Sequence, residues 1–202
     1  MRFDIIKGKE EFIKMKLVSI NKKYQGKYLS YYVATYLLDN NEIKEYELVS
    51  RNPRLNISNF GKVNPAGVGM VTYSEDKKKI LLQKEFRMAT NNYVYNFPAG
   101  LIDEGESPID TARRELKEET GLDLIEIIDV LPPSFAAQGT SDEMMYIVIC
   151  TCKGDLSPSI YAEEEISASW YDKNQIKQLL DNKAYMSVRT QMYLYSWVNQ
   201  KD

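Results

Sequence analysis

One short helix, bounded at both ends by its own sequence signals, constrains this chain more than any other feature. The segment GLIDEGESPIDTARRELKEETGL begins at Gly100. Ser107 is a favourable N-cap, Pro108 suits the first helical position, and Asp110 stands three residues after the cap, as in a capping box. Gly121 supplies a natural C-terminal stop. The pattern therefore predicts a helix over 107–120 that is entered directly from a loop.

This predicted helix carries an apolar seam and an acidic ridge. At about 100° per residue, Ile109, Ala112 and Leu116 fall in one arc. The carboxylates of the neighbouring arc belong to Glu115, Glu118 and Glu119. Like charges at these spacings repel by roughly a few tenths of a kcal/mol per pair, so a compensating cation is expected. An acidic run is more often only a solvated face, and the loop before the helix decides between the two interpretations.

Composition restricts which cation this can be. The chain has no His and only two Cys, so metal sites built from imidazole or from several thiolates are excluded. Mg²⁺ prefers carboxylate oxygens, keeps several waters and shares its shell with substrate phosphates. In the loop, Pro98, Ala99 and Gly100 form a turn. Glu106 lies eight residues before Arg114, close enough for an ion pair that braces the loop against the helix.

Together these residues resemble the Nudix box. The resemblance has no departure at the specified positions, which are Gly100, Glu106, Arg114, Glu115, Leu116, Glu118, Glu119, Gly121 and Leu122. It implies a Nudix hydrolase, a divalent-metal enzyme that cleaves nucleoside diphosphates linked to another moiety. The implied fold class is α/β (α+β), a Nudix-type α/β/α sandwich with a mixed sheet, plus an N-terminal antiparallel β extension.

A wider similarity runs to the ADP-ribose pyrophosphatase branch of this family. LLQKEFRMATNNYVYNFPAGLIDEGE resembles its strand that ends in an Arg, here Arg87, and leads to the Pro-Ala-Gly turn. GTSDE at 139–143 resembles the loop after the box helix, and YAEEEI at 161–166 resembles the acidic loop. Two departures bear on the substrate: Asn96 stands where Glu is common, and residues 135–138 replace a Ser-Pro approach to the Gly. The reaction implied is hydrolysis of ADP-ribose to AMP and ribose 5-phosphate.

The resemblance assigns the metal site to the helix and the turn. Hydrolysis of a pyrophosphate needs neutralised oxygens and a water held in line, and metal ions supply both. Glu115 and Glu119, one turn apart, are the first predicted ligands, with the backbone carbonyl of Ala99 completing the cluster. Glu118 is the third carboxylate, either as a direct ligand or through water. The cofactor expected is Mg²⁺, with Mn²⁺ as a substitute.

A further carboxylate is needed to take the proton of the attacking water, because the chain has no His. In the resembled branch it comes from the acidic loop, where Glu163, Glu164 and Glu165 stand. Glu164 is favoured slightly over Glu165 as the base and is also a candidate metal ligand. Glu143 remains an alternative.

Other residues are predicted to bind the substrate or to shape the motif. Arg51 and Arg87 are candidates for gripping the diphosphate or the terminal ribose, since guanidinium binds phosphate oxygens bidentately. They are equally candidates for surface ion pairs. Glu143 is a third candidate for substrate contact. Structural roles within the motif are predicted for Gly100, Glu106, Arg114 and Gly121.

The rest of the chain predicts a strand-rich fold. Strand patterns cover 29–38, 43–50, 66–73, 79–87, 124–131, 144–152 and 166–171, and helical patterns cover 173–181 and 185–199. We predict an N-terminal hairpin extension at 1–58 and a Nudix domain at 59–202. The hairpin resembles strands that the branch uses in dimer contacts, so a homodimer is expected. The alternative is a sheet extension within a monomer.

Composition agrees with an enzyme that acts on a small molecule. At 202 residues and 44% hydrophobic content, the chain can bury one core plus a small extension. A net charge of −3 gives no reason to expect nucleic acid as a partner. No apolar run approaches a membrane span and the first residues lack a signal-peptide pattern, so a cytoplasmic location is expected. Cys150 and Cys152 alternate on a predicted strand and are expected to pack as small apolar side chains.

Two alternatives to ADP-ribose hydrolysis remain. Within the same reaction class, the substrate could be another nucleotide sugar, a dinucleotide cofactor or a dinucleoside polyphosphate. Outside it, the chain could be a module that senses ADP-ribose without hydrolysis. Such a module would be free to lose the carboxylates of the helix, and Glu115, Glu118 and Glu119 are all present.

Overall fold

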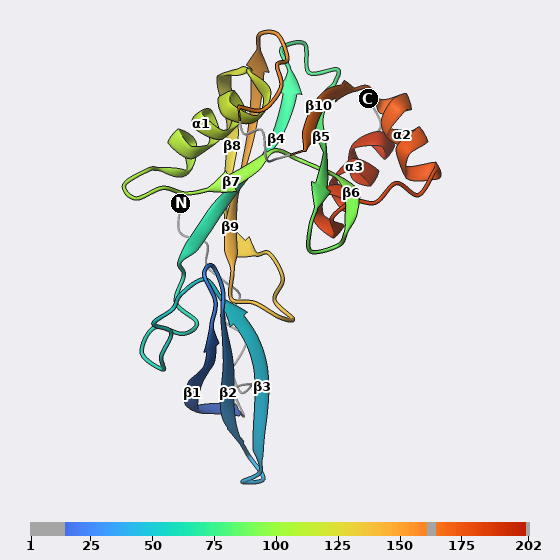
Figure 1. Ribbon diagram of the computed structural model, residues 1–202. Coiled ribbons are helices and arrows are strands. Elements are labelled where there is room, and N and C mark those ends of the chain that lie inside the picture. The colour runs from blue at the N-terminus through green and yellow to red at the C-terminus, as the bar shows by residue number, and fades with distance from the viewer. Residues whose placement is uncertain (1–14, 161–164, 201–202) are drawn as a thin grey trace, which may run out of the picture. The chain divides into compact units, whose positions relative to one another are not determined.

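The computed structural model describes residues 15–160 and 165–200 and divides the chain into two compact units (Figure 1). The first unit contains the described residues up to Asn64 together with Phe135–Glu143. The second unit contains Pro65–Ser134 and the described residues from Met144 onward.

The first unit is built on a three-stranded antiparallel sheet. Its order is β1-β2-β3, with β1 (Met15–Gln25), β2 (Ser30–Leu38) and β3 (Ile43–Ser50). The predicted hairpin is confirmed, and its turn places Asn41 at a φ of 63°, a conformation that Asn tolerates better than most residues. The strand β1 was not predicted, because most of its side chains are exposed and lack a clear alternation.

The second unit is built on a seven-stranded sheet. Its strands are β4 (Pro65–Ser74), β5 (Ile80–Arg87), β6 (Asn92–Asn96), β7 (Ala99–Leu101), β8 (Asp123–Phe135), β9 (Met144–Lys153) and β10 (Ile166–Tyr171). Along the main path the order is β10-β5-β4-β9-β8, while β6 pairs with β5 and β7 pairs with β4. The β4–β9 pair is parallel and the β5 pairs are antiparallel, so the sheet is mixed, as predicted.

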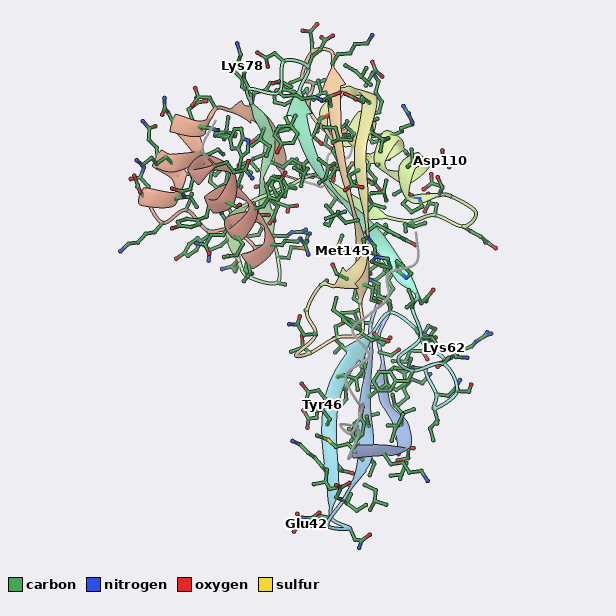
Figure 2. All side chains as sticks on the ribbon, turned by 180° about the vertical axis from the view of Figure 1, so that it is seen from behind. Glu42, Tyr46, Lys62, Lys78, Asp110 and Met145 are labelled. Atoms are coloured by element: carbon green, nitrogen blue, oxygen red, sulfur yellow. The ribbon has the colours of Figure 1, made fainter. Side chains whose placement is uncertain are left out.

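Helices cover both faces of this sheet. They are α1 (Pro108–Thr120), α2 (Lys173–Asp181) and α3 (Val188–Asn199). Figure 1 shows α1 on one side of the strands and the α2–α3 pair on the other, and Figure 2 shows Asp110 on α1 from behind. Alternation along β5 explains both layers, because Leu81 packs in the core that contains Leu116, and Leu82 packs in the core that contains Leu194. The predicted α/β/α sandwich is confirmed.

Two details differ from the sequence prediction. The last helix begins at Val188 rather than near residue 185, because the Ser187 side chain accepts a hydrogen bond from the Thr190 backbone and caps it there. The strands β6 and β7 are only five and three residues long, too short to give a periodic pattern. In the part of the chain that the structure describes, no helix is long and apolar enough to cross a membrane.

The two cysteines lie where the alternation predicts. Both are free and buried in the core beneath α1. Burial raises the pKa of the Cys150 thiol to about 11 and that of Cys152 to about 12. Both thiols are therefore protonated near neutral pH and pack as small apolar side chains.

Candidate active site

Local signals fix both ends of α1. At its start the Ser107 side chain accepts a hydrogen bond from the Asp110 backbone at 3.2 Å, and the Asp110 carboxylate accepts one from the Ser107 backbone at 3.3 Å. At its end Gly121 has a φ of 77°, and a Cβ there would lie 2.2 Å from the Ser157 hydroxyl oxygen. The left-handed conformation and the close approach both require glycine. With Leu116 fully buried, the acidic ridge is held in one orientation.

Gly100 lies directly against the side chain of Glu115. A Cβ at position 100 would lie 1.8 Å from the Glu115 carboxyl carbon and 2.0 Å from Oε1. Only a residue without a side chain at position 100 leaves room for the Glu115 carboxylate. The Ala99–Gly100 backbone is fixed in turn, because β7 pairs antiparallel with β4 and places Ala99 opposite Gly69. The turn that carries Ala99 and the helix that carries Glu115 therefore approach closely at Gly100.

Arg114 joins the acidic residues of the loop and the helix. Its guanidinium donates two hydrogen bonds to Glu106, from Nε at 2.8 Å and from Nη2 at 2.9 Å. Nη1 donates to Glu115 at 2.8 Å and to Glu118 at 3.1 Å. Nη2 also donates to the Leu101 carbonyl at 3.0 Å. The loop–helix ion pair that the spacing predicts is present, and the same arginine offsets the repulsion along the ridge.

These hydrogen bonds shift the pKa values of Glu106 and Arg114 in opposite directions. Hydrogen bonds from Arg114 and from the Thr111 hydroxyl lower the pKa of Glu106 from its ordinary value of 4.5 to about 2. The hydrogen bond to Glu106 raises the pKa of Arg114, which stays charged under all ordinary conditions. A bidentate pair of this kind holds the loop as a fixed wall beside the helix.

The Glu106 shift predicts how stability depends on acid. Because the folded pKa lies below the unfolded one, the pair contributes its full stability above pH 4.5 and loses it as the pH falls toward 2. Glu106→Gln should lower the free energy of unfolding at pH 7 and flatten its dependence on pH between about 4.5 and 2. Urea unfolding at a series of pH values measures both. An unchanged acid slope in the variant would show that other carboxylates govern that window.

Glu119 is the most buried carboxylate of the ridge. Only 6% of it is exposed, and its Oε2 accepts a hydrogen bond of 2.8 Å from Nε2 of Gln83 on β5. Gln83 is itself 1% exposed. Sequence reasoning did not single out Gln83. The available signal was an amide inside the otherwise apolar run ILLQ, on the same strand face as Leu81.

The face of β5 that carries Gln83 continues with further polar groups. Gln83 is paired with Asn96 on β6. Asn96 donates a hydrogen bond of 2.8 Å to Glu85, and Arg87 forms an ion pair with the same oxygen at 2.8 Å. Arg87 is therefore engaged in an ion pair, as one of its two predicted roles requires, and its guanidinium is about half exposed.

Of the two favoured candidates for the base, only Glu165 lies among the described residues. Glu164 lies outside the described residues. Glu165 is described, and its carboxylate accepts a hydrogen bond from the Tyr93 hydroxyl on β6. That contact raises the pKa of Tyr93. Its backbone carbonyl accepts a hydrogen bond of 3.2 Å from Phe86. The end of the acidic loop is therefore anchored to the β5–β6 pair.

Two predicted substrate-binding residues meet in the first unit. Nε of Arg51 lies 2.7 Å from Oε1 of Glu143. The segment that carries Glu143 is held to the end of β3, because Val49 donates to the Thr140 carbonyl at 2.9 Å. The Ser50 hydroxyl also donates to Asp142, at 3.0 Å. Both charged side chains are partly exposed, so this pair remains able to meet a ligand.

The donor groups near α1 suit a hard cation. Within the described residues, no three acidic or thiol side chains form a closed metal cage. Mg²⁺ does not require one, since it keeps several waters and takes only one or two carboxylates from the protein. The Glu115 carboxylate lies beside Gly100, one turn from buried Glu119, and both side chains offer oxygen donors of the appropriate kind.

Comparison with known families agrees with this geometry. The model of the NUDIX domain matches residues 63–190, more than half of the chain. The chain belongs to the Nudix family. Members of this family generally use divalent metal ions, and the matched range contains α1, the Ala99–Gly100 turn and the β5–β6 pair.

Several known proteins are similar in sequence to this chain. An ADP-ribose pyrophosphatase of Bacillus subtilis is 26% identical over 134 residues, 66% of this chain and 64% of that protein. An ADP-sugar pyrophosphatase of Mus musculus is 30% identical, over 65% of this chain and 58% of that protein. An ADP-ribose pyrophosphatase of Saccharomyces cerevisiae is 32% identical, over 75% of this chain and 64% of that protein. The matched part thus spans less than two thirds of the length of each relative.

A solved structure shares the Nudix fold over most of this chain. The crystal structure of an ADP compounds hydrolase superposes with a TM-score of 0.67 at 21% identity. It covers 92% of this chain and 95% of that one. The mixed sheet between helical layers is therefore the fold of this chain.

Proposed function

We propose that this protein is a Mg²⁺-dependent pyrophosphohydrolase that cleaves ADP-ribose to AMP and ribose 5-phosphate. The observation that carries the proposal is the Glu115 carboxylate that lies beside Gly100, one helical turn from buried Glu119. Three relatives whose names specify ADP-ribose or ADP-sugar support the choice of substrate.

In this proposal the oxygens of Glu115, Glu119 and the Ala99 carbonyl would hold the cation, which supplies positive charge beside the pyrophosphate oxygens. Glu118 adds a carboxylate at the edge of the same ridge. Arg114 donates a hydrogen bond to Glu115 and another to Glu118, and its positive charge offsets the repulsion between them. Gln83 on β5 donates a hydrogen bond to Glu119 and so fixes its orientation, as neighbouring hydrogen-bond donors commonly do for metal ligands.

One further carboxylate of the chain would act on the attacking water. A water oxygen attacks one phosphorus, the bond to the bridging oxygen breaks, and a carboxylate takes the proton of the water. We assign the base to the acidic loop, with Glu164 first and Glu165 second. The Glu165 carboxylate already accepts a hydrogen bond from the Tyr93 hydroxyl, which leaves it fewer lone pairs for a water, so we keep Glu164 first. Glu143 stays a third candidate.

A panel of nucleoside diphosphate derivatives tests this function. The protein is incubated with Mg²⁺ and ADP-ribose, ADP-glucose, NADH or a diadenosine polyphosphate, and the products are separated and quantified. We expect the highest kcat/KM with ADP-ribose and equal amounts of AMP and ribose 5-phosphate. Higher kcat/KM with another compound would assign that compound as the substrate. No turnover with either Mg²⁺ or Mn²⁺ would contradict an enzymatic role and favour a sensing module.

The N-terminal hairpin has a proposed role in assembly. Its sheet exposes apolar side chains that include Val18, Tyr24, Ile43 and Tyr46, which supports its use as a contact between two copies. We propose a cytoplasmic homodimer with the extension at 1–58 as the dimer element. Light scattering on the purified protein should give about twice the mass of the 23.4 kDa chain.

A further inference from the structure

A cavity in the second unit lies beside the β5–β6 pair. It has a volume of about 590 Å³, within the range of roughly 300–1,000 Å³ that is usual for small-molecule sites. One wall is the end of β5, the turn after it and β6, from Arg87 to Asn96. The other wall is the segment 185–189, which leads into α3. The Tyr95 backbone donates to the Tyr185 carbonyl at 2.8 Å and joins the two walls.

One side chain of this cavity has a buried atom without a partner. Asn96 is 7% exposed, and its Oδ1 has no hydrogen-bond partner among the described residues. Its orientation is fixed, because the amide nitrogen donates to Glu85 and the reverse orientation would set Oδ1 against that carboxylate. A buried acceptor left unpaired is unfavourable. A donor from outside the protein, such as a hydroxyl, would satisfy it.

The charges of the cavity suit an anion. Two arginines line it, Arg87 and Arg189, and none of the described residues that line it is acidic. Arg87 contacts Glu85 through Nε, and a guanidinium carries four more donors on its Nη atoms. Thr90 and Asn92 add polar groups on the same wall, and α3 begins at the other. Guanidinium groups and a helix N-terminus both favour phosphate oxygens.

The cavity is adjacent to the catalytic helix. Asn96 is paired with Gln83 across β5 and β6, so their Cβ atoms lie roughly 4.5–5.5 Å apart on one face. Gln83 in turn donates to Glu119 at 2.8 Å. A ligand whose hydroxyl reaches Asn96 therefore lies one side-chain pair from the carboxylate that we assign to the metal.

We propose that this cavity binds the phosphorylated sugar on the far side of the bond that is cleaved. Asn96 Oδ1 accepts a hydrogen bond from a sugar hydroxyl, and Arg189 and Arg87 bind the phosphate. This inference rests on the proposed function for the name of its ligand. Asn96 and Arg189 would then determine which sugar phosphate is bound. Asn96 is also one of the positions at which this chain departs from the branch that it resembles, since Glu is common there.

Binding of fragments to the metal-free protein tests the site without turnover. Ribose 5-phosphate, inorganic phosphate and ribose are titrated separately by calorimetry into wild type, Arg189→Gln and Asn96→Leu. Arg189 is exposed, so its variant should fold, and Arg54→Gln is the matched control in the first unit. A melting curve checks that Asn96→Leu is folded.

We expect ribose 5-phosphate to bind more tightly than phosphate or ribose. Arg189→Gln should weaken both ribose 5-phosphate and phosphate about tenfold or more, since one charge-assisted contact is lost. Asn96→Leu should weaken ribose 5-phosphate to the level of phosphate and leave phosphate unchanged. Arg54→Gln should match wild type. With the cleaved substrate, Arg189→Gln should raise KM about tenfold with kcat little changed.

Failure of this site and failure of the proposed function give different results. If ADP-ribose is hydrolysed but ribose 5-phosphate binds no better than phosphate, or Arg189→Gln binds it as wild type does, the cavity does not bind the sugar phosphate. Asn96 then holds only an ordered water. If no nucleoside diphosphate is cleaved but ribose 5-phosphate binds with the expected variant effects, the cavity is a sugar-phosphate site and the enzymatic proposal is wrong.

Discussion

Glu119→Gln should reduce kcat about a hundredfold or more while the protein stays folded. The substitution removes the charge of the most buried carboxylate of the ridge, and a neutral amide is a poor ligand for a hard cation. The fold should survive, because the new amide keeps an oxygen that can accept the hydrogen bond from Gln83. Loss of positive charge beside the pyrophosphate oxygens then removes stabilisation that is specific to the transition state.

Three measurements on this variant separate the metal from the fold. Steady-state kinetics at saturating Mg²⁺ gives kcat, calorimetric titration with Mn²⁺ gives metal affinity, and urea unfolding gives stability. Glu126→Gln is the matched control, since Glu126 is an exposed carboxylate on β8 that pairs with Lys77. We expect the control to behave as wild type in all three. Near-normal turnover by Glu119→Gln would remove Glu119 as a ligand.

The helix of the box could be predicted in detail because its signals are local. Capping by Ser107 and Asp110, the left-handed Gly121 and the buried seam are each encoded within a few residues of where they act. The ion pair between Glu106 and Arg114 was predictable for the same reason, as both lie on one loop–helix unit.

What the sequence could not supply are contacts across strands. The hydrogen bond from Gln83 to Glu119 joins positions 36 residues apart, and it depends on which strand of the sheet lies beneath α1. The pairing of Asn96 with Gln83 likewise depends on the register of β6, a strand of five residues with no periodic signal. Propensity and periodicity describe single segments, whereas these contacts follow from how the segments pack.

The role of Gly100 depends on a contact with a residue that is distant in sequence. From sequence Gly100 belongs to a turn, where glycine is common. In the structure its role is set by Glu115, whose carboxyl carbon would lie 1.8 Å from a Cβ at position 100. Nothing in the local sequence indicates that the turn and the middle of α1 approach so closely.

Gly100→Ala should therefore abolish most activity with only a modest effect on stability. A contact below 3.0 Å cannot be kept, and the atoms in the way belong to the flexible end of the Glu115 side chain. We expect that end to swing away, which breaks its hydrogen bond with Arg114 and moves the carboxylate that we propose as a metal ligand away from the turn. A ligand displaced by an ångström or more should lower kcat/KM by about a hundredfold.

Gly139→Ala is the matched control, because a Cβ at Gly139 would meet no atom within 4 Å. Turnover and Mn²⁺ affinity should both fall in Gly100→Ala and neither should fall in Gly139→Ala, while the two unfold at similar urea concentrations. Activity lost in step with stability would point to disruption of β7 instead, since Gly100 is paired with Val68 there. Activity retained in a stable Gly100→Ala variant would show that Glu115 does not need its place beside the turn, and the metal site would have to be built on Glu119 and Glu118 instead.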